Sequence, residues 1–531
     1  MEEFKNNLIA PDFYNMAEDI DKHGDDQTKI ALYWENENGE EKILPYWKLR
    51  SESNRLGNGL KEMGLSKGDK VMILVPRTPE AYIIYLACLK LGLILMPGSE
   101  LLMSKDILYR VSHAGAKGVI AHHSLTDRVD EIRGQTDTLT HFIVVGEEKE
   151  GWTSYFSLKE NQSNQLEIEK TSRDDIAFLS YTSGTTGNPK GVIHTHSWAY
   201  AHQEVAAKLW LDVKPNDIVW ATAGPGWAKW IWSPFISTLG IGAAGLSYLG
   251  KFEPKKYLSL LEKYQVNVLC CTPTEYRLMA KVDGLEQYDL RHLRSAVSAG
   301  EPLNREVIDT FKRYFNVEVR DGYGQTENTL LVGTLKGMEV KAGSMGQPTP
   351  GNQVAIIDDD GKPVKKGEVG DIAVNRNAPA LFKGYYQDPE RTSMAFRGDW
   401  YVTGDQARED EDGYFWFEGR SDDIIISAGY TIGPFEVEDA LVKHPLVAEC
   451  AVVASPDEIR GSIVKAFVVL KDHSKACEDL VKELQDHVKK VTAPYKYPRE
   501  IEFVTELPKT TSGKIRRVEL RKMEKERKKQ A

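Results

Sequence analysis

The sequence predicts an α/β fold, with a large N-terminal domain of layered α/β sheets, a small β-barrel-like unit, and a smaller α+β C-terminal domain. Strand-like apolar runs alternate with amphipathic stretches through the first ~400 residues, a rhythm typical of layered, mostly parallel sheets. Short strands with tight turns follow over 351–384, and strand–helix–strand pieces follow Gly419. Because 531 residues exceed one ordinary core, we expect two domains, 1–421 and 422–531.

The alternation is clearest in three pairs of segments. A strand at "KVMILVP" precedes a helix at "PEAYIIYLACLKLG", "GVIAHH" precedes "SLTDRVDEIRG", and "VNVLCCTP" precedes "TEYRLMAKV". The most apolar run, Tyr82 to Gly98, contains Lys90, Gly92 and Pro97. It is too short and too interrupted to cross a bilayer, so we expect a core helix ending near Gly92 and then a buried strand.

The later part of the chain has a different texture. Asp-Gly and Lys-Lys-Gly turns in "NQVAIIDDDGKPVKKGEVGDIAVN" predict a small antiparallel β unit. The chain ends in the basic, helical tail "KIRRVELRKMEKERKKQA". Because Glu519, Glu524 and Glu526 lie among its bases, we interpret the tail as a solvated helix end and not as a nucleic-acid-binding arm.

Composition excludes several classes of protein. Hydrophobic residues make up 41% and charged residues 28% of the chain, as in ordinary globular proteins, and the net charge of -11 argues against a nucleic-acid partner. The five cysteines form no C-x-x-C pair, so a disulfide framework or a zinc site is not expected. The start "MEEFKNNLIA" lacks a signal or transit pattern, and we expect a cytoplasmic protein without a membrane span.

The stretch "YTSGTTGNPKG" at 181–191 has the composition of a phosphate-binding loop. Gly184 and Gly187 let the backbone approach a ligand, the flanking hydroxyls donate hydrogen bonds, and Lys190 supplies a positive charge. It is not a Walker loop, and "TTSGKIRR" is not one either, since no hydroxyl residue follows Lys514. The alternative is a Gly/Thr-rich surface turn after the strand "DDIAFLSY".

Two other patterns are weaker. "GIGAAG" at 240–245 fits the dinucleotide fingerprint, but it follows no clear strand and precedes no helix. "HTH" at 194–196 places two imidazoles on one side of a strand, but no third metal ligand is evident. We expect a structural or pocket-lining role for the two histidines.

Six segments together carry a family resemblance across nearly the whole chain. The sequence resembles the adenylate-forming superfamily, which comprises acyl-CoA synthetases, adenylation domains and luciferases. "GWAKWIW", "CTPTEYRLM" and "APYKYPREIEFV" resemble the medium-chain acyl-CoA synthetases most. The six segments are "YTSGTTGNPKGV" (181–192), "SAGEPL" (298–303), "DGYGQTE" (321–327), "WYVTGD" (400–405), "GRSDDIIISAGYTIGPFEVE" (419–438) and "PKTTSGK" (508–514).

The resemblance implies an ATP-dependent, AMP-forming acyl-CoA synthetase that uses ATP, coenzyme A and Mg²⁺. A carboxylate attacks the α-phosphate of ATP to give an acyl-adenylate and pyrophosphate, and the thiol of coenzyme A then displaces AMP. Two alternatives remain open: an adenylating enzyme that loads a carrier-protein thiol, and a non-catalytic ATP or AMP sensor. The expected partners are small molecules, and the oligomeric state is left open, a homodimer included.

The resemblance also assigns roles to residues that bind ATP. Lys514 is the expected catalytic lysine, bridging carboxylate and phosphate oxygens, and Glu327 matches the magnesium ligand. Asp405 and Arg420 would hold the ribose. The full expected ATP-binding set is Thr182, Ser183, Gly184, Thr185, Thr186, Gly187, Asn188, Pro189, Lys190, Gly300, Glu301, Pro302, Asp321, Gly322, Tyr323, Gly324, Gln325, Thr326, Asp405, Arg420 and Lys514.

In the family the C-terminal domain is mobile and rotates between the two half-reactions. Asp422 matches the hinge position. Thr431 stands where many relatives have an arginine that touches the phosphates, so a fixed charge is absent there. By the same resemblance the residues expected to bind coenzyme A are Arg77, Ala428, Gly429, Tyr430, Arg460, Lys489, Lys496, Tyr497 and Pro498.

The aromatic segment "GWAKWIWSPF" is the candidate wall of an acyl pocket. Trp227, Lys229 and Trp232 are its expected lining, and bulky indoles would favour short, branched or medium-chain acids over long ones. The alternative is that the segment forms the aromatic core of a helix N-terminus.

Overall fold

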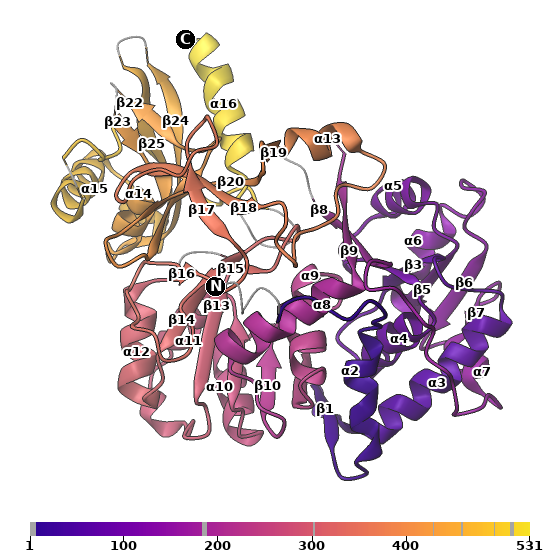
Figure 1. Ribbon diagram of the computed structural model, residues 1–531. Helices are drawn as coiled ribbons and strands as arrows, with labels where there is room; N and C mark the ends of the chain where they lie inside the picture. The colour runs from indigo at the N-terminus through magenta and orange to yellow at the C-terminus, as the bar shows by residue number, and fades with distance from the viewer. Residues whose placement is uncertain are drawn as a thin grey trace. The chain divides into compact units, whose positions relative to one another are not determined.

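The computed structural model describes residues 7–182, 188–300, 303–427, 430–457, 460–492, 494–509 and 515–530 (Figure 1). The chain divides into two compact units, Met1–Val354 with Val374–Asp399, and Ala355–Ala373 with Trp400–Ala531. The boundary predicted after residue 421 falls inside the second unit and stays a prediction. None of the helices among the described residues is long and apolar enough to cross a membrane.

The first unit contains a seven-stranded sheet in the order β7-β6-β5-β3-β4-β8-β9. Its neighbouring strands are parallel except for the antiparallel pair β8–β9. Its strands are β3 (Lys70–Leu74), β4 (Ile94–Pro97), β5 (Gly118–His122), β6 (His141–Val145), β7 (Thr153–Ser154), β8 (Ile176–Thr182) and β9 (Lys190–Thr195). The helices of this part are α2 (Ala17–Asp21), η1 (Lys22–Asp25), α3 (Tyr46–Glu62), α4 (Pro79–Lys90), α5 (Ser104–Ala114), η2 (His123–Leu125), α6 (Thr126–Asp130) and α7 (Tyr155–Lys159).

The apolar run from Tyr82 to Gly98 folds as predicted. Helix α4 ends at Lys90, and the buried strand β4 begins at Ile94. The fully buried ammonium of Lys90 donates to Ser53 Oγ (3.0 Å) and Asn54 Oδ1 (2.7 Å) and pairs with the Asp21 carboxylate. A charge inside this helix is therefore compensated within the protein core.

A nine-stranded sheet in the order β16-β15-β14-β13-β12-β10-β11-β1-β2 completes the first unit. Figure 1 shows α10, α11 and α12 beside this sheet. Its strands are β1 (Ile30–Asn36), β2 (Glu41–Pro45), β10 (Ile218–Ala221), β11 (Ala244–Leu249), β12 (Val268–Cys271), β13 (Ser295–Ala299), β14 (Val319–Gly324), β15 (Leu330–Gly333) and β16 (Gln347–Pro348). Its helices are α8 (His196–His202), η3 (Gln203–Leu211), α9 (Ala228–Trp230), η4 (Ile231–Ser237), α10 (Pro254–Lys263), α11 (Pro273–Ala280), η5 (Leu285–Gln287) and α12 (Arg305–Phe315).

Local sequence explains several element boundaries in this sheet. Helix α11 begins with a capping box, because the Thr272 side chain accepts from the Glu275 amide while Glu275 accepts from the Thr272 amide. The segment 240–245 lies between η4 and β11, so its glycines precede a strand where a dinucleotide fingerprint would follow one.

The second unit begins with a small β sheet in which β17, β18 and β20 are successive neighbours and β21 pairs antiparallel with β20. It continues with the β22–β23 hairpin and a three-stranded sheet in the order β24-β25-β26. The elements from β17 onward are β17 (Val354–Ile357), β18 (Val369–Asn375), α13 (Pro389–Met394), β19 (Phe396–Arg397), β20 (Trp400–Glu409), β21 (Phe415–Arg420), β22 (Ile425–Ser427), β23 (Tyr430–Ile432), α14 (Pro434–Val442), β24 (Val447–Asp457), β25 (Gly461–Leu470), η6 (His473–Lys475), α15 (Glu478–Val491), β26 (Glu500–Phe503) and α16 (Arg517–Gln530).

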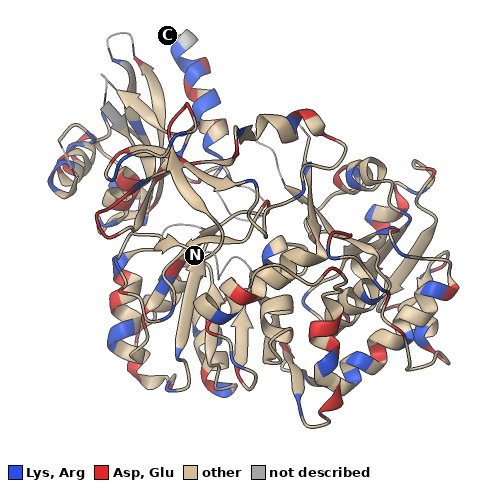
Figure 2. Ribbon diagram, in the orientation of Figure 1, with Lys and Arg blue, Asp and Glu red and all other residues tan. Residues whose placement is uncertain are grey.

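The C-terminal helix α16 is not simply a solvated tail, contrary to the sequence interpretation. Figure 2 shows both charge signs along it, but Leu520 and Glu524 are buried. Glu524 accepts from Ser455 Oγ (2.9 Å) and Lys465 Nζ (2.8 Å) on β24 and β25. The periodic charges of the sequence gave no indication that one of them lies inside.

Candidate active site

The predicted phosphate loop joins two antiparallel strands. Thr182 at the end of β8 pairs with Lys190 at the start of β9. Asn188 and Pro189 are described, and their carbonyls accept from Arg391 Nη1 (3.1 Å) and Tyr109 OH (3.1 Å). A Walker loop runs from a strand into a helix, so this hairpin confirms that the loop is of another kind.

Lys190 and Glu327 lie together and share one neighbour, Tyr385. Lys190 Nζ is 3.8 Å from Glu327 Oε1 and donates to Tyr385 OH at 3.1 Å. The Tyr385 hydroxyl donates to Glu327 Oε1 at 2.9 Å. Glu327 is buried, while the side chain of Lys190 is 26% exposed. A cation and a carboxylate are therefore held next to the predicted phosphate loop.

Sequence reasoning missed Tyr385. It lies 58 positions after Glu327, and no spacing rule relates the two residues. The segment 383–386 pairs with β9, because Ile193 and Lys383 exchange hydrogen bonds that include Ile193 N to Gly384 O (3.1 Å) and Lys383 N to Ile193 O (3.0 Å). Only this pairing between distant segments reveals the residue, and a single sequence carries no signal for it.

The predicted adenine-flanking segments lie on neighbouring parallel strands. Ser298 of β13 pairs with Asp321 of β14, which places Gly300 and Gly322–Tyr323 at the same edge of the sheet. Close packing requires glycine in β14, since a Cβ on Gly324 would approach Thr329 O to 2.1 Å. The edge where parallel strands end is the usual ligand side of such sheets.

Two buried hydroxyls at these strand ends lack a partner. Among the described residues, Thr182 Oγ1 and Ser298 Oγ make no hydrogen bond. Buried polar atoms are nearly always satisfied, so an exception calls for an explanation. A multi-oxygen ligand at the ends of β8 and β13 would supply the missing partners.

Asp321 is a buried carboxyl with strongly shifted acidity. Burial raises its pKa to about 8, although hydrogen bonds from the backbone amides of Gly322 and Leu303 oppose the shift. At neutral pH this side chain is therefore mostly protonated and can donate as well as accept hydrogen bonds.

The histidines of "HTH" have structural partners. His194 Nε2 donates to Thr326 O (2.5 Å), and His196 Nδ1 accepts from Met16 N (3.2 Å). Burial lowers the pKa of each imidazole to about 4, so both are neutral. His194 thereby ties β9 to the turn 325–328, in which Gln325 N donates to Asn328 Oδ1 (2.8 Å).

In the second unit, the two predicted ribose ligands are cross-strand partners. Asp405 of β20 pairs with Arg420 of β21, and Arg420 Nη1 is 4.0 Å from Asp405 Oδ1. Asp422, the predicted hinge residue, accepts from Arg420 Nε (3.3 Å) and Arg521 Nη2 (3.2 Å). Arg521 also pairs with Asp423, so the predicted hinge is held by ion pairs to α16.

The residues expected to bind coenzyme A are distributed over both units. In the second unit, Lys489 Nζ lies 4.4 Å from the Tyr497 ring centroid, and Lys496 Nζ is 2.6 Å from Glu436 Oε2. The Pro498 carbonyl accepts from Gln485 Nε2 (3.0 Å), and the Arg460 amide donates to Asp457 Oδ1 (2.8 Å). Tyr430 lies on β23, across the hairpin from Ser427.

Arg77 is the member of that set in the first unit. Its Nη2 donates to Thr222 O (2.8 Å), and its carbonyl accepts from Trp34 Nε1 (2.8 Å). The guanidinium is thus fixed against the strand end after β10.

The aromatic segment divides into three environments. Trp230 is buried against Tyr82 and Phe235, with ring centroids 5.0 and 5.3 Å away. Trp232 contacts Trp198 and His202, at 5.9 and 5.4 Å between ring centroids. Lys229 Nζ lies 4.9 Å from the Trp210 ring centroid, and Trp227 is 37% exposed. The aromatic-core interpretation therefore applies to Trp230, while Trp227, Lys229 and Trp232 stay predicted pocket residues.

Several predicted residues lie outside the described part of the chain, so their arrangement is not characterised. They are Ser183, Gly184, Thr185, Thr186, Gly187, Glu301, Pro302, Ala428, Gly429 and Lys514.

The chemistry of the site fits a magnesium ion held by one carboxylate. Mg²⁺ commonly takes one or two carboxylates, substrate phosphates and water. Among the described residues no group of three or more metal-ligating side chains occurs, and Glu327 lies beside Lys190 with a free approach toward phosphate oxygens at the loop. Glu327 could therefore contribute the protein's share of such a site.

Comparisons with known proteins agree with this geometry. The sequence profile described as "AMP-binding enzyme" matches residues 20–386, and that of the "AMP-binding enzyme C-terminal domain" matches residues 436–514. The chain is 59% identical over 520 residues to the uncharacterized acyl-CoA ligase YtcI of Bacillus subtilis (strain 168), covering 98% of each chain. It is 43% identical to human mitochondrial acyl-coenzyme A synthetase ACSM3, covering 97% of this chain and 91% of the other.

Solved structures give the same result. The anthranilate CoA ligase AuaEII in complex with anthranoyl-AMP is 32% identical, with a TM-score of 0.90 over 97% of this chain and 98% of that one. A benzoate CoA ligase from Burkholderia xenovorans LB400 is 29% identical, with a TM-score of 0.84 over 96% of this chain and 100% of that one. These similarities confirm the predicted superfamily and α/β fold. The chain belongs to the AMP-binding enzyme family, the group that includes these acyl-CoA ligases.

Proposed function

We propose that the protein is an AMP-forming acyl-CoA synthetase that activates a short, medium or branched-chain carboxylic acid. The observation that carries the proposal is the grouping of Lys190 and Glu327 beside the loop that follows Thr182. Here the ends of β9 and β14, from two different sheets, meet through Lys190–Glu327 and His194–Thr326 contacts. Such an edge suits a polyphosphate with its metal.

The first half-reaction joins two anions, so the protein must offset their repulsion. Lys190 and the loop 182–190 would neutralise the β- and γ-phosphates, and Lys514 would bridge the attacking carboxylate and the α-phosphate. Removing one such preorganised donor commonly costs about 3 kcal/mol of transition-state stabilisation. Mg²⁺, when bound at Glu327, would withdraw charge from the phosphate oxygens.

The nucleoside would be held from several sides. Tyr323 would stack on the adenine, with Gly300 and Asp321 at its edges. Asp405 would accept hydrogen bonds from the ribose hydroxyls, and Arg420 would donate to them. Their cross-strand pairing in the second unit supports this joint role.

The second half-reaction transfers the acyl group to the thiol of coenzyme A. We propose that the domain after Asp422 rotates between the steps and that residues 427–430 then border the thiol's path. The basic residues Arg77, Arg460, Lys489 and Lys496 would bind the phosphates of coenzyme A. A cytoplasmic location and a homodimer also stay predictions.

An acid panel with ATP, Mg²⁺ and coenzyme A tests the proposal. We expect thioester and equimolar AMP, with the highest turnover on acids of about four to ten carbons, since the indoles shorten the proposed pocket. Benzoate and anthranilate belong in the panel because solved relatives are named for them. A preference for palmitate would contradict the proposed chain length.

The same assay separates the two alternatives. AMP release that does not depend on free coenzyme A would indicate loading of a carrier-protein thiol. No pyrophosphate exchange with a mixed acid pool would support the ATP or AMP sensor.

A further inference from the structure

We infer that Tyr385 is a positioning residue that keeps Lys190 and Glu327 from forming a direct ion pair, and so keeps both charges available to magnesium-bound ATP. The inference rests on the proposed function, since it assigns Lys190 to phosphate and Glu327 to the metal. None of the sequence motifs described above includes Tyr385.

The distances place the phenol between the two charges. Lys190 Nζ donates to the hydroxyl at 3.1 Å, and the hydroxyl donates to Glu327 Oε1 at 2.9 Å. The ammonium remains 3.8 Å from the carboxylate, whereas a direct charge-assisted hydrogen bond would be about 2.8 Å long. Lys190 Nζ also lies 4.4 Å from the centre of the Tyr385 ring, a cation–π distance.

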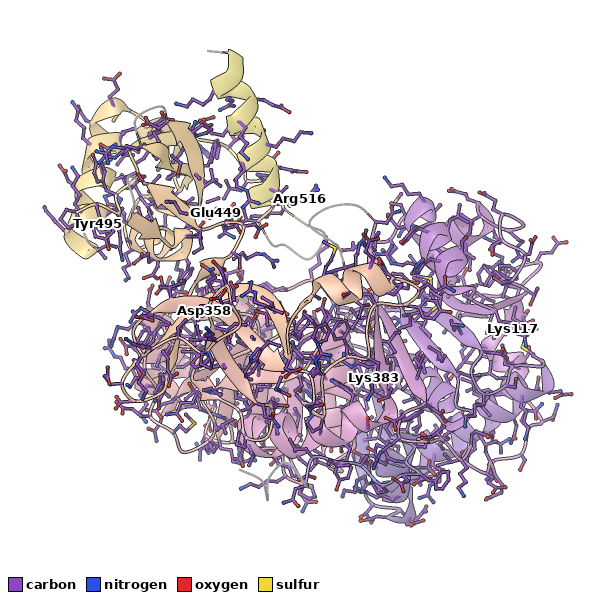
Figure 3. The ribbon with its side chains drawn as sticks, turned by 45° about the horizontal axis from the view of Figure 1, so that its top comes forward. Lys117, Asp358, Lys383, Glu449, Tyr495 and Arg516 are labelled. Carbon is purple, nitrogen blue, oxygen red and sulfur yellow. The ribbon has the colours of Figure 1, made fainter. Side chains whose placement is uncertain are left out.

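The backbone fixes the ring on both sides. Phe382 N donates to Glu327 O (2.7 Å), and Tyr386 N donates to Gly191 O (2.7 Å), so the segment is attached to the chain next to each charged residue. Tyr385 N donates to Thr392 Oγ1 (2.9 Å). Lys383, labelled in Figure 3, marks the start of this pairing with β9. A side chain attached at three points is well suited to hold two others apart.

Loss of the hydroxyl would change the electrostatics of the site. Glu327 is buried, so an unpaired carboxylate there is costly, and Lys190 is the nearest cation. Without the phenol oxygen, the two side chains can close the remaining distance and neutralise each other. Magnesium would then have to displace an ammonium from its carboxylate ligand, and the phosphates would lose a free cation.

The test compares Tyr385→Phe with Tyr386→Phe, the same change at the adjacent tyrosine. Tyr386 packs against His113 and not on the Lys190–Glu327 pair. Binding of α,β-methylene-ATP is measured by titration calorimetry over a range of Mg²⁺ concentrations. We expect Tyr385→Phe to raise the half-saturating Mg²⁺ concentration about ten-fold or more and Tyr386→Phe to change it less than about two-fold.

A double-mutant cycle distinguishes positioning from general damage. Lys190→Met removes the cation that would close onto Glu327, so adding Tyr385→Phe to it should change the Mg²⁺ requirement less than about two-fold. If Tyr385→Phe does not fold, Thr392→Val loosens the backbone of Tyr385 and should shift the requirement in the same direction by a smaller factor. An unchanged Mg²⁺ requirement in the folded variants overturns the inference. Wild-type protein that does not bind the nucleotide overturns the proposed function instead.

Discussion

The guanidinium of Arg517 donates to both carboxylate oxygens of Glu438, from Nε at 3.1 Å and from Nη2 at 2.6 Å. Glu438 is buried on α14 and also accepts from Val452 N (2.8 Å). Burial raises the pKa of Glu438, and the Arg517 charge opposes that shift. Arg517 opens α16 as the third residue after Lys514, so this ion pair fixes the chain next to the proposed catalytic lysine.

Replacing Glu438 with Gln should weaken this attachment and affect the two half-reactions unequally. We expect a loss of about 2 kcal/mol in unfolding free energy, because a bidentate buried pair is broken. Adenylation, followed by pyrophosphate exchange, should fall further than thioester formation from preformed acyl-adenylate, since only the first step uses Lys514. Glu524→Gln is the matched control, a buried carboxyl on the same helix but further from Lys514. Equal loss of both half-reactions in Glu438→Gln, as in the control, would argue against a role in placing the lysine.

Lys514→Ala tests the central lysine directly. Adenylation should fall by about two to three orders of magnitude, the usual effect of losing one preorganised donor. Thioester formation from preformed acyl-adenylate should survive largely intact, because the proposed rotation removes Lys514 from the nucleotide in that step. Quench-flow measurement of each half-reaction gives the answer, and parallel losses would contradict the proposed domain rotation.

Asp321 predicts a dependence of stability on pH. Its pKa is about 8 in the folded protein against 3.8 as the reference value. The folded state therefore holds the proton over a pH range in which the unfolded state has released it, and stability declines as pH rises through this window, by at most about 1.4 kcal/mol per pH unit.

Asp321→Asn removes this titration and keeps the oxygen that accepts from Gly322 N. Between pH 6 and pH 8 the wild-type protein should lose about 2 kcal/mol of unfolding free energy relative to the variant, measured by urea denaturation without nucleotide. Profiles that run parallel over this range would show that Asp321 is ionised in the folded protein.

Trp227 and Trp230 separate pocket from core in the aromatic segment. Trp227→Ala should raise kcat/KM for acids of twelve or more carbons relative to butyrate by about ten-fold, if the exposed indole limits chain length. Trp230→Ala should lower the unfolding free energy by about 3 kcal/mol, since it leaves a cavity among Tyr82, Tyr85 and Phe235, without changing that ratio. Acid-panel kinetics beside thermal unfolding of both variants decide the matter. A ratio that responds to Trp230 and not to Trp227 would move the pocket elsewhere.

Local pattern was sufficient for much of the fold. Alternating segments located β3 with α4, β5 with α6 and β12 with α11, because burial dictates their period. The breakers Gly92 and Pro97 correctly separated α4 from β4. The short loop motifs also placed Lys190 and Glu327 in one candidate site, and these residues lie together.

What pattern could not give were contacts between distant segments. Tyr385 reaches Glu327 only because 383–386 pairs with β9, and strand pairing between remote segments is not written in local periodicity. The burial of Glu524 had the same cause. A glutamate among lysines in a helical tail looks solvated until its partner, Lys465, is known to lie on a strand beneath it.

That partner gives the end of the chain an importance its composition conceals. Lys465 is 9% exposed and is surrounded by Glu524 at 2.8 Å and Glu502 at 3.0 Å, and α16 rises from Arg516, labelled in Figure 3, to cover it. Trimming the last ten residues, as an exopeptidase would, removes Glu524 and strands an ammonium group between β-strands. The lysine-rich terminus is thus a plug that the small sheet cannot shed, and affinity tags placed there should follow Gln530 and replace nothing before it.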